Sequence, residues 1–189
     1  MKSKIILPIL FIVLLVVAII VMQDPSEQTK TMGEKDVLVK LDSAKIDKME
    51  IDSDLGNVVL QKEGDRWQMI EPVDYPADMQ RVTRTVGILA DMTRKALVSK
   101  NPEKRSIYKV DTAGGKRLKV YEGGQKKIDL MVGKYGNSPR ETYVREFDKD
   151  EVLLVDGALS FMMNAAVKDW RDRAVLHARK QNINKIKYK

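Results

Sequence analysis

The feature that most constrains this chain is an uninterrupted apolar segment near its N-terminus. Residues 5–22 carry no charge, and Pro8 is the only one of them outside the hydrophobic class. As a helix this segment would rise about 27 Å, close to the roughly 30 Å hydrocarbon core of a bilayer. Because it has no polar face to meet water, we predict a transmembrane helix and not a buried helix of a soluble domain.

The flanks of this segment predict its orientation. Lys2 and Lys4 precede it and Asp24 follows it, which favours a cytoplasmic N-terminus. A cleaved signal peptide, the alternative, has a shorter apolar core that ends in small residues, whereas bulky residues end this segment. We therefore expect residues 1–22 to be an uncleaved single-pass anchor in a bacterial cytoplasmic membrane. The remaining chain would then face the periplasm or the cell exterior.

The predicted topology limits which partners the net positive charge of the chain can meet. The 189 residues include 34 Lys+Arg and 27 Asp+Glu, a formal net charge of +7. Without Lys2 and Lys4 the remainder carries +5, but the two signs are interspersed, which is typical of a solvated surface. We expect no nucleic-acid partner outside the membrane. Attraction to anionic lipid or to a polyanionic envelope polymer is the alternative.

The chain has no cysteine and only one histidine, and this excludes several kinds of catalytic and metal-binding site. The chain has no cysteine, which excludes disulfides, a thiolate nucleophile, iron–sulfur clusters and cysteine-bound zinc. Its one histidine, His177, excludes a site with two histidines and is expected on the surface beyond the last helix. We predict no catalytic, cofactor-binding or metal-binding residues and no cofactor.

The rest of the chain divides by composition. Residues 23–36 are polar and predict a tether. Residues 37–181 predict an α+β domain, a mostly antiparallel β-rich unit with two amphipathic helices. The strands are expected at 37–39 and 49–51, separated by a short turn or a single helical turn at 43–47, and at 57–62, 66–70, 117–123, 126–133, 142–148 and 151–157.

The two helices are predicted from spacing and caps. The first follows an N-cap at Asp78 and runs to about Arg94, with a buried stripe at Met79, Val82, Val86, Leu89 and Thr93. The second is capped by Asp156 or Ser160. Its expected core residues are Leu159, Met163, Ala166, Val167 and Trp170.

The end of the chain echoes its beginning. Residues 183–188 (INKIKY) resemble residues 46–51 (IDKMEI) in their order of apolar and charged positions. We therefore expect residues 182–189 to be the first strand of a second, truncated unit. The chain would then be a fragment, or a short member of a longer repeat family.

Several motifs together resemble a known family. They are a W-x-M-x-x-P segment, a Pro-Ala-Asp helix start, a central tyrosine, a hydrophobic-Gly pair, a Tyr-Val-Arg run and a closing Trp-Arg-Asp-Arg. Their residues are Trp67, Met69, Pro72, Pro76, Ala77, Asp78, Tyr108, Val132, Gly133, Tyr143, Val144, Arg145, Trp170, Arg171, Asp172 and Arg173. With the N-terminal anchor, this pattern resembles the bacterial domain of unknown function 4340 from about Val37 to the C-terminus.

The resemblance implies a membrane-anchored, often repeated unit. Members' genes commonly neighbour those of gliding-type or auxiliary ABC transporter components, which implies an accessory role at an envelope transport complex. No functional residues carry over from the family. A function that needs two units is in doubt for a chain that stops where the second would begin.

Three catalytic or binding motifs fail when their spacing is tested. Lys116 follows two glycines, but Val110 and Arg117 stand where a phosphate loop needs Gly and Ser or Thr. Residues 106–109 spell S-x-x-K without the accompanying motifs of that enzyme class. Asp52, Asp54 and Glu63 match positions 1, 3 and 12 of a calcium loop, but the flanks are predicted strands. Residues 148–151 predict a turn.

These observations favour a non-enzymatic, membrane-anchored extracytoplasmic domain. Its expected partner is another envelope protein, such as a transporter component, docked by β-addition at an exposed strand edge such as residues 184–189. The alternative is a module that binds envelope glycan or anionic lipid. A carboxylate-dependent hydrolase is a third hypothesis, since such a site needs neither Cys nor His.

Overall fold

The computed structural model describes residues 11–15 and 37–174, and the fold is given for these residues alone. The strands are β1 (Ile46–Asp52), β2 (Val58–Glu63), β3 (Arg66–Glu71), β4 (Tyr75–Pro76), β5 (Thr93–Ser99), β6 (Lys116–Glu122), β7 (Gln125–Tyr135), β8 (Glu141–Glu146) and β9 (Val152–Asp156). The helices are α2 (Met79–Ala90) and α3 (Leu159–Met163). Three 3-10 turns are η2 (Pro102–Lys104), η3 (Ser106–Tyr108) and η4 (Val167–Trp170).

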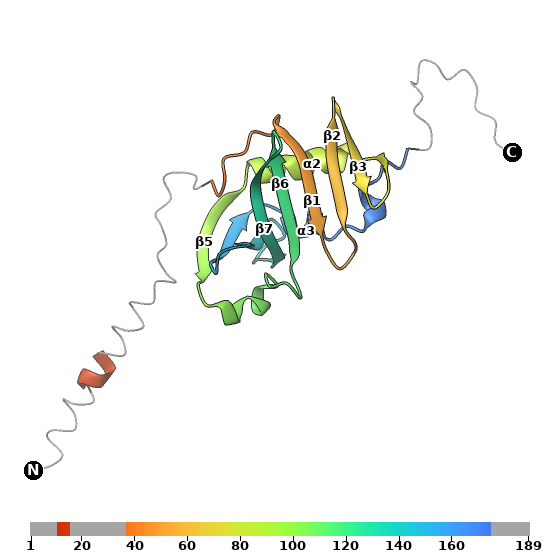
Figure 1. Ribbon diagram of the computed structural model, residues 1–189. Helices are drawn as coiled ribbons and strands as arrows, with labels where there is room; N and C mark the ends of the chain where they lie inside the picture. The colour runs from red at the N-terminus through yellow and green to blue at the C-terminus, as the bar shows by residue number, and fades with distance from the viewer. Residues whose placement is uncertain (1–10, 16–36, 175–189) are drawn as a thin grey trace, which may run out of the picture.

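The described strands form one antiparallel sheet in the order β4-β3-β2-β1-β6-β7-β8-β9-β5. Two meanders, β1 to β4 and β6 to β9, meet where β1 pairs with β6. Between them the chain passes through α2 to β5 at the opposite edge (Figure 1). The prediction of an α+β domain with a mostly antiparallel sheet is confirmed.

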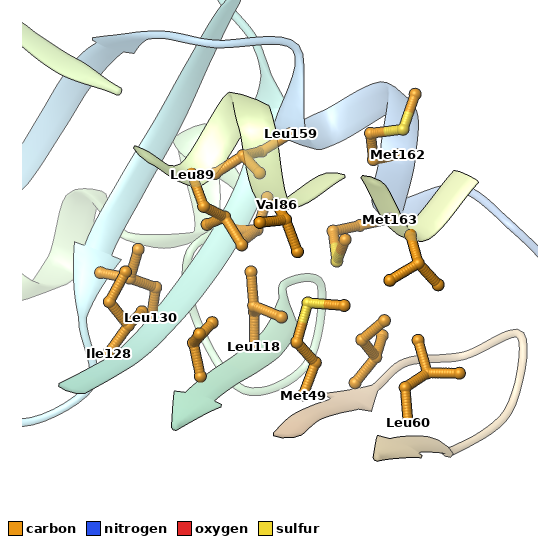
Figure 2. Close-up of a cluster of buried hydrophobic side chains, with 14 of the residues drawn as sticks. Met49, Leu60, Val86, Leu89, Leu118, Ile128, Leu130, Leu159, Met162 and Met163 are labelled. Carbon is orange, nitrogen blue, oxygen red and sulfur yellow. The ribbon is translucent and has the colours of Figure 1, made fainter. Parts of the chain in front are cut away.

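One face of the sheet carries the main hydrophobic core. Side chains alternate between the two faces of each strand, so every second residue points toward the helices. Figure 2 shows Val86 and Leu89 of α2 facing Leu118 and Leu130 of the sheet. The largest side chains in this core are less than 2% exposed: Trp170, Ile46, Met49, Leu60, Met69, Leu89, Met92, Leu118, Leu130, Leu159, Met163 and Val58.

Helix α2 begins where the sequence predicts and ends earlier. The Asp78 side chain accepts a hydrogen bond from the Arg81 N–H at 3.0 Å and caps the helix. The helix ends at Ala90, so the prediction that it reaches Arg94 is wrong, and Thr93 begins β5. Residues 93–99 include good helix formers, but pairing with β9 outweighs that local preference.

The predicted second long helix is also wrong. Helix α3 has five residues and follows Ala158, and a separate turn, η4, carries Trp170. The Asp169 carboxylate accepts a hydrogen bond from the Ala166 N–H at 3.1 Å, which starts that turn afresh. The break lets Trp170 reach the start of α2, where its ring lies 5.4 Å from the Arg81 guanidinium carbon.

Strand β5, which the sequence reading missed, forms one edge of the sheet. Its pairing with β9 has two register irregularities, and Arg94 and Lys95 are exposed. Such features are typical of edges that resist association with other strands. The predicted strand at 37–39 is reduced to a bridge between Val37 and Thr93.

Among the described residues, none forms a helix of the length and apolar character that crossing a membrane requires. Residues 11–15 are helical, and their apolar side chains are 46–66% exposed. The rest of the apolar segment, the tether at 23–36, His177 and residues 182–189 lie outside the described part of the chain.

Candidate functional site

The face of the sheet opposite the helices has a second, smaller core. The segment from Lys100 to Gly115 leaves β5, forms η2 and η3, and covers part of this face. Val110 packs there on Met131 of β7 and Val152 of β9. Partly buried side chains surround this cluster: Val98, Tyr108, Tyr143 and Phe147. The segment 100–115 is therefore anchored to the sheet and not a free loop.

Two glycines allow the covering segment to approach the sheet closely. A Cβ built on Gly133 of β7 would lie 2.1 Å from the Tyr108 carbonyl oxygen and 2.8 Å from a Val110 methyl. A Cβ on Gly115 would lie 2.8 Å from the Met131 Cε methyl of β7 and 2.6 Å from the Asp111 carbonyl oxygen within the segment. Real Cβ atoms do not approach so closely, so each position requires glycine for this packing.

Arg145 of β8 binds the same segment by hydrogen bonds to backbone carbonyls. Its side chain is buried, and Nε donates to the Val110 carbonyl at 3.0 Å. Nη1 donates to the carbonyls of Glu146, Phe147 and Lys149 at 3.1, 2.7 and 2.8 Å. Burial, and then the nearby Arg105 guanidinium, lower the pKa of Arg145 from its usual value. A buried cation bound to backbone carbonyls thus joins segment 100–115 to the β8–β9 turn.

The covering segment and the β7–β8 turn enclose a surface hollow of about 430 Å³. Six residues line it: Lys109, Lys134, Tyr135, Gly136, Asn137 and Tyr143. We call this feature the Lys–Tyr hollow. It contains cations, phenol rings and an amide, and none of its six lining residues has a carboxylate.

Two tyrosines hold one of the lysines in place. The rings of Tyr108 and Tyr143 lie 4.8 Å apart between centroids, tilted by 47°. The Lys134 ammonium lies 5.9 Å from the first ring centroid and 6.0 Å from the second. Attraction between a cation and aromatic faces orients this ammonium without neutralising its charge.

The second lysine stands on an unusual backbone. Lys109 adopts φ 56° and ψ 41°, the left-handed conformation that non-glycine residues seldom use. Its N–H donates to the Ser106 carbonyl at 3.1 Å, which closes η3. Neither Lys109 nor Lys134 forms an ion pair with any residue in the described part of the chain. Both positive charges are therefore available to a ligand.

At the β7–β8 turn, the Glu141 carboxylate already has hydrogen-bond donors within the domain. The Glu141 carboxylate accepts from the Lys95 ammonium at 2.8 Å and from the Asn137 N–H at 3.0 Å. The hydrogen bond from Lys95 is the main cause that lowers the pKa of Glu141, although burial opposes it. Glu141 therefore orders the turn and is neutralised by Lys95, so the Lys–Tyr hollow keeps its positive charge.

A smaller hollow of about 150 Å³ lies at the other end of β7. There the Asp129 carboxylate accepts two hydrogen bonds from Arg117, at 2.8 and 3.0 Å, and a third from Lys126 at 2.7 Å. The Arg117 guanidinium also stacks 3.4 Å above the Phe147 ring centroid. These groups satisfy one another, which favours a structural role for this second hollow.

The structure assembles neither a phosphate loop nor a calcium site from the residues of the tested motifs. Lys116 begins a strand, and not the helix that a phosphate loop requires, and it pairs with Asp54 at 3.7 Å. Asp52 and Asp54 lie at one end of β2, and Glu63 lies at the other. These three carboxylates cannot share one calcium ion. No cluster of metal-ligating side chains occurs in residues 11–15 and 37–174.

Residues of the family-like motifs gather in two places. Trp67, Ala77 and Asp78 meet Trp170 by backbone hydrogen bonds of 2.9 Å from Ala77 to Trp67 and 2.8 Å from Asp78 to Trp170. The other group, Tyr108, Gly133, Tyr143 and Arg145, forms or supports the Lys–Tyr hollow. The sequence reading named these four as motif residues, and it missed Lys109, Lys134 and Tyr135 as lining residues. No local spacing links Lys109 to the consecutive residues Lys134 and Tyr135, because Lys109 meets them only when segment 100–115 folds onto β7.

Comparison with known proteins gives one match. The family model described as Domain of unknown function (DUF4340) matches residues 67–189, about two thirds of the chain. Neither the curated proteins nor the solved structures contain a match. The matched region spans the sheet from β3 onward, α2, α3 and every residue that lines the Lys–Tyr hollow. The chain belongs to the DUF4340 family.

Proposed function

We propose that this chain is a non-enzymatic binding module, anchored in the bacterial cytoplasmic membrane and exposed on its outer side. The observation that carries the proposal is the Lys–Tyr hollow. Its lining offers unpaired ammonium groups, phenol rings and an amide, which bind ligands well. Lysine and tyrosine can take part in acid–base or nucleophilic catalysis when another group activates them, and this lining supplies no carboxylate, imidazole or thiol to do so.

The membrane part of the proposal rests on the sequence. The apolar segment at 5–22 has the length of a single span, and Lys2 and Lys4 favour a cytoplasmic N-terminus. The chain enters the sheet where Val37 bridges Thr93. Through the register of β5, β9 and β8, Thr93 lies in line with Asp156 and Glu141, so the β7–β8 turn is at the same end of the sheet.

We further propose that the module serves as an accessory component of an envelope complex, of the kind associated with ABC transporters. The family-like motifs that suggested this role include Tyr143, which lines the Lys–Tyr hollow, and Tyr108 and Gly133, which pack beside it. Binding through this hollow is an alternative to β-addition, because the described edge strand β5 has the irregular pairing of a protected edge.

A pair of photo-crosslinking variants tests this function. Tyr135 in the hollow and Phe161 on α3 are 64% and 65% exposed, so they are a matched pair. We replace each in turn by a photoreactive phenylalanine in the full chain and irradiate native membranes. We expect a discrete adduct from position 135 and none from position 161. Equal adducts from both positions, or none from position 135, would contradict a binding role for the hollow.

A further inference from the structure

We propose that the Lys–Tyr hollow binds a carboxylated sugar, the hexuronic acid unit of an acidic glycan. This inference rests on the proposed binding function and names its ligand class. The two ammonium groups of Lys109 and Lys134 supply the charge that a carboxylate needs. The other groups in the hollow indicate that the rest of the ligand is a sugar.

Neutral polar groups in the hollow match the hydroxyls of a sugar. The Asn137 side-chain amide has donors and an acceptor, and the Tyr143 hydroxyl can both donate and accept. Neither group makes a side-chain hydrogen bond to another described residue. A site for a simple anion needs only the cations. The free Asn137 amide and Tyr143 hydroxyl can also bind the hydroxyl groups of a ligand.

Aromatic faces supply the third element of sugar recognition. Tyr135 lines the hollow and is 64% exposed, so its ring is accessible to a ligand. The C–H groups of a pyranose ring form an apolar face that packs against such a ring. Tyr143 is a half-buried residue of the same lining, and its ring lies 4.8 Å from the ring of Tyr108. A stacked sugar ring would cover Tyr135 and bring its carboxylate toward the lysines.

The size and shape of the hollow favour a sugar over an acidic peptide. A cavity of about 430 Å³ falls within the range of 300–1,000 Å³ that small ligands occupy. An extended peptide would instead pair with a sheet edge or follow a groove along several strands. The lining of the hollow is confined to the end of β7, the β7–β8 turn, one residue of β8 and Lys109, so it is of a size for one or two sugar units and not for an extended chain.

Isothermal titration of the full chain in nanodiscs of zwitterionic lipid tests the inference. Three probes are compared: tetragalacturonate, neutral maltotetraose and a hexaglutamate peptide. We expect tetragalacturonate to bind at least tenfold more tightly than either of the others, and its affinity to fall as sodium chloride is added. No binding of tetragalacturonate, or equal binding of hexaglutamate, would overturn the assignment of a sugar.

Matched variants locate the binding. Lys134→Gln and Tyr135→Leu should each weaken tetragalacturonate binding at least tenfold. Lys168→Gln removes the same charge from η4, outside the hollow, and should leave the affinity within twofold. Equal losses for Lys134→Gln and Lys168→Gln would show diffuse charge attraction and overturn the site. A crosslink from position 135 without tetragalacturonate binding would overturn the ligand class and leave the proposed function standing.

Discussion

At the scale of single residues, buried and half-buried charges have distinct structural tasks. Arg145 binds backbone carbonyls from two segments and lacks a carboxylate hydrogen bond among the described residues. Glu50 on β1 is a carboxylate between two lysines: Lys48 at 2.8 Å and Lys119 at 2.9 Å. Each makes a prediction that a single substitution checks.

Replacing Arg145 by Met should destabilise the domain by about 3 kcal/mol, since buried carbonyls lose a charged donor and none replaces it. Arg145→Lys keeps the charge but cannot reach the same set of carbonyls, because an ammonium lacks the guanidinium fork. It should restore only part of the stability. Urea unfolding followed by circular dichroism measures both variants. A loss below about 0.5 kcal/mol for Arg145→Met would contradict the bracing role.

Glu50 should make stability depend on acid pH. Burial alone would raise the pKa of Glu50, but hydrogen bonds from Lys48, Lys119 and Tyr121 outweigh it and lower the pKa from 4.5 to about 2. A lowered folded-state pKa contributes stability that is present above pH 4.5 and lost as pH falls toward 2. The contribution is at most about 3 kcal/mol for a shift of this size.

Urea unfolding at several pH values between 6 and 2 measures this effect. Glu50→Gln should flatten the loss of stability between pH 4.5 and 2 relative to the unsubstituted chain. Glu63→Gln, at the exposed β2–β3 turn, is the control and should leave the profile unchanged. The same slope in Glu50→Gln as in the unsubstituted chain would show that Glu50 is not a source of the acid dependence.

At the scale of elements, the defining event is the docking of segment 100–115 on the sheet. Gly133→Ala tests it, because the added Cβ would collide with the Tyr108 carbonyl oxygen at 2.1 Å. We expect a loss of roughly 1–3 kcal/mol, as for other overpacked sites. Gly87→Ala in α2 is the control, and it should change stability in the opposite direction. Its Cβ meets nothing within 4 Å, so it should stabilise the domain by about 0.5–1 kcal/mol.

Urea unfolding distinguishes the two alanine variants by the sign of the change. Tetragalacturonate titration adds a second readout for Gly133→Ala, because a displaced segment 100–115 moves Lys109 away from the hollow. A Gly133→Ala chain as stable as the unsubstituted chain would show that the segment does not rest on β7 as described.

The elements that sequence reading predicted are those with local signals. The hairpin at Gly123–Gly124 and the strands at 57–62 and 66–70 have clear turns and alternation, and the structure confirms them. Strand β5 was missed because its place depends on β9, which lies over 50 residues later in the chain. The long second helix was wrong because Trp170 packs against α2, a contact that spacing along 156–170 cannot reveal.

The candidate site was predictable only in part, for the same reason. Tyr108, Gly133, Tyr143 and Arg145 were recognised as motif residues, but nothing in their spacing showed that they converge. Lys109 and Lys134 gave no signal of their own in a chain with 34 basic residues. Their significance comes from the lack of a nearby free carboxylate, which is a property of the folded sheet.

At the scale of the whole molecule, an apolar segment at residues 5–22 precedes a domain of the DUF4340 family that has a cationic, aromatic hollow. The membrane anchor, the outward-facing domain and the occupied hollow are proposals that one chain can test. The natural absence of cysteine makes this convenient, because any introduced cysteine is a unique reactive group.

The most direct measurement is the labelling of single cysteines at positions 138 and 161 by a membrane-impermeant maleimide. Ser138 follows the lining residue Asn137 in the β7–β8 turn but does not itself line the hollow, so Ser138→Cys keeps every group that is proposed to bind the ligand. In spheroplasts, we predict that Phe161→Cys reacts at the same rate as in the purified chain, because it is outside the membrane and unoccupied. Ser138→Cys should react more slowly in spheroplasts than after purification, because a ligand covers the adjacent hollow. If neither cysteine reacts until the membrane is lysed, the domain is cytoplasmic. If position 138 reacts at the same rate before and after purification, the hollow is not an occupied binding site.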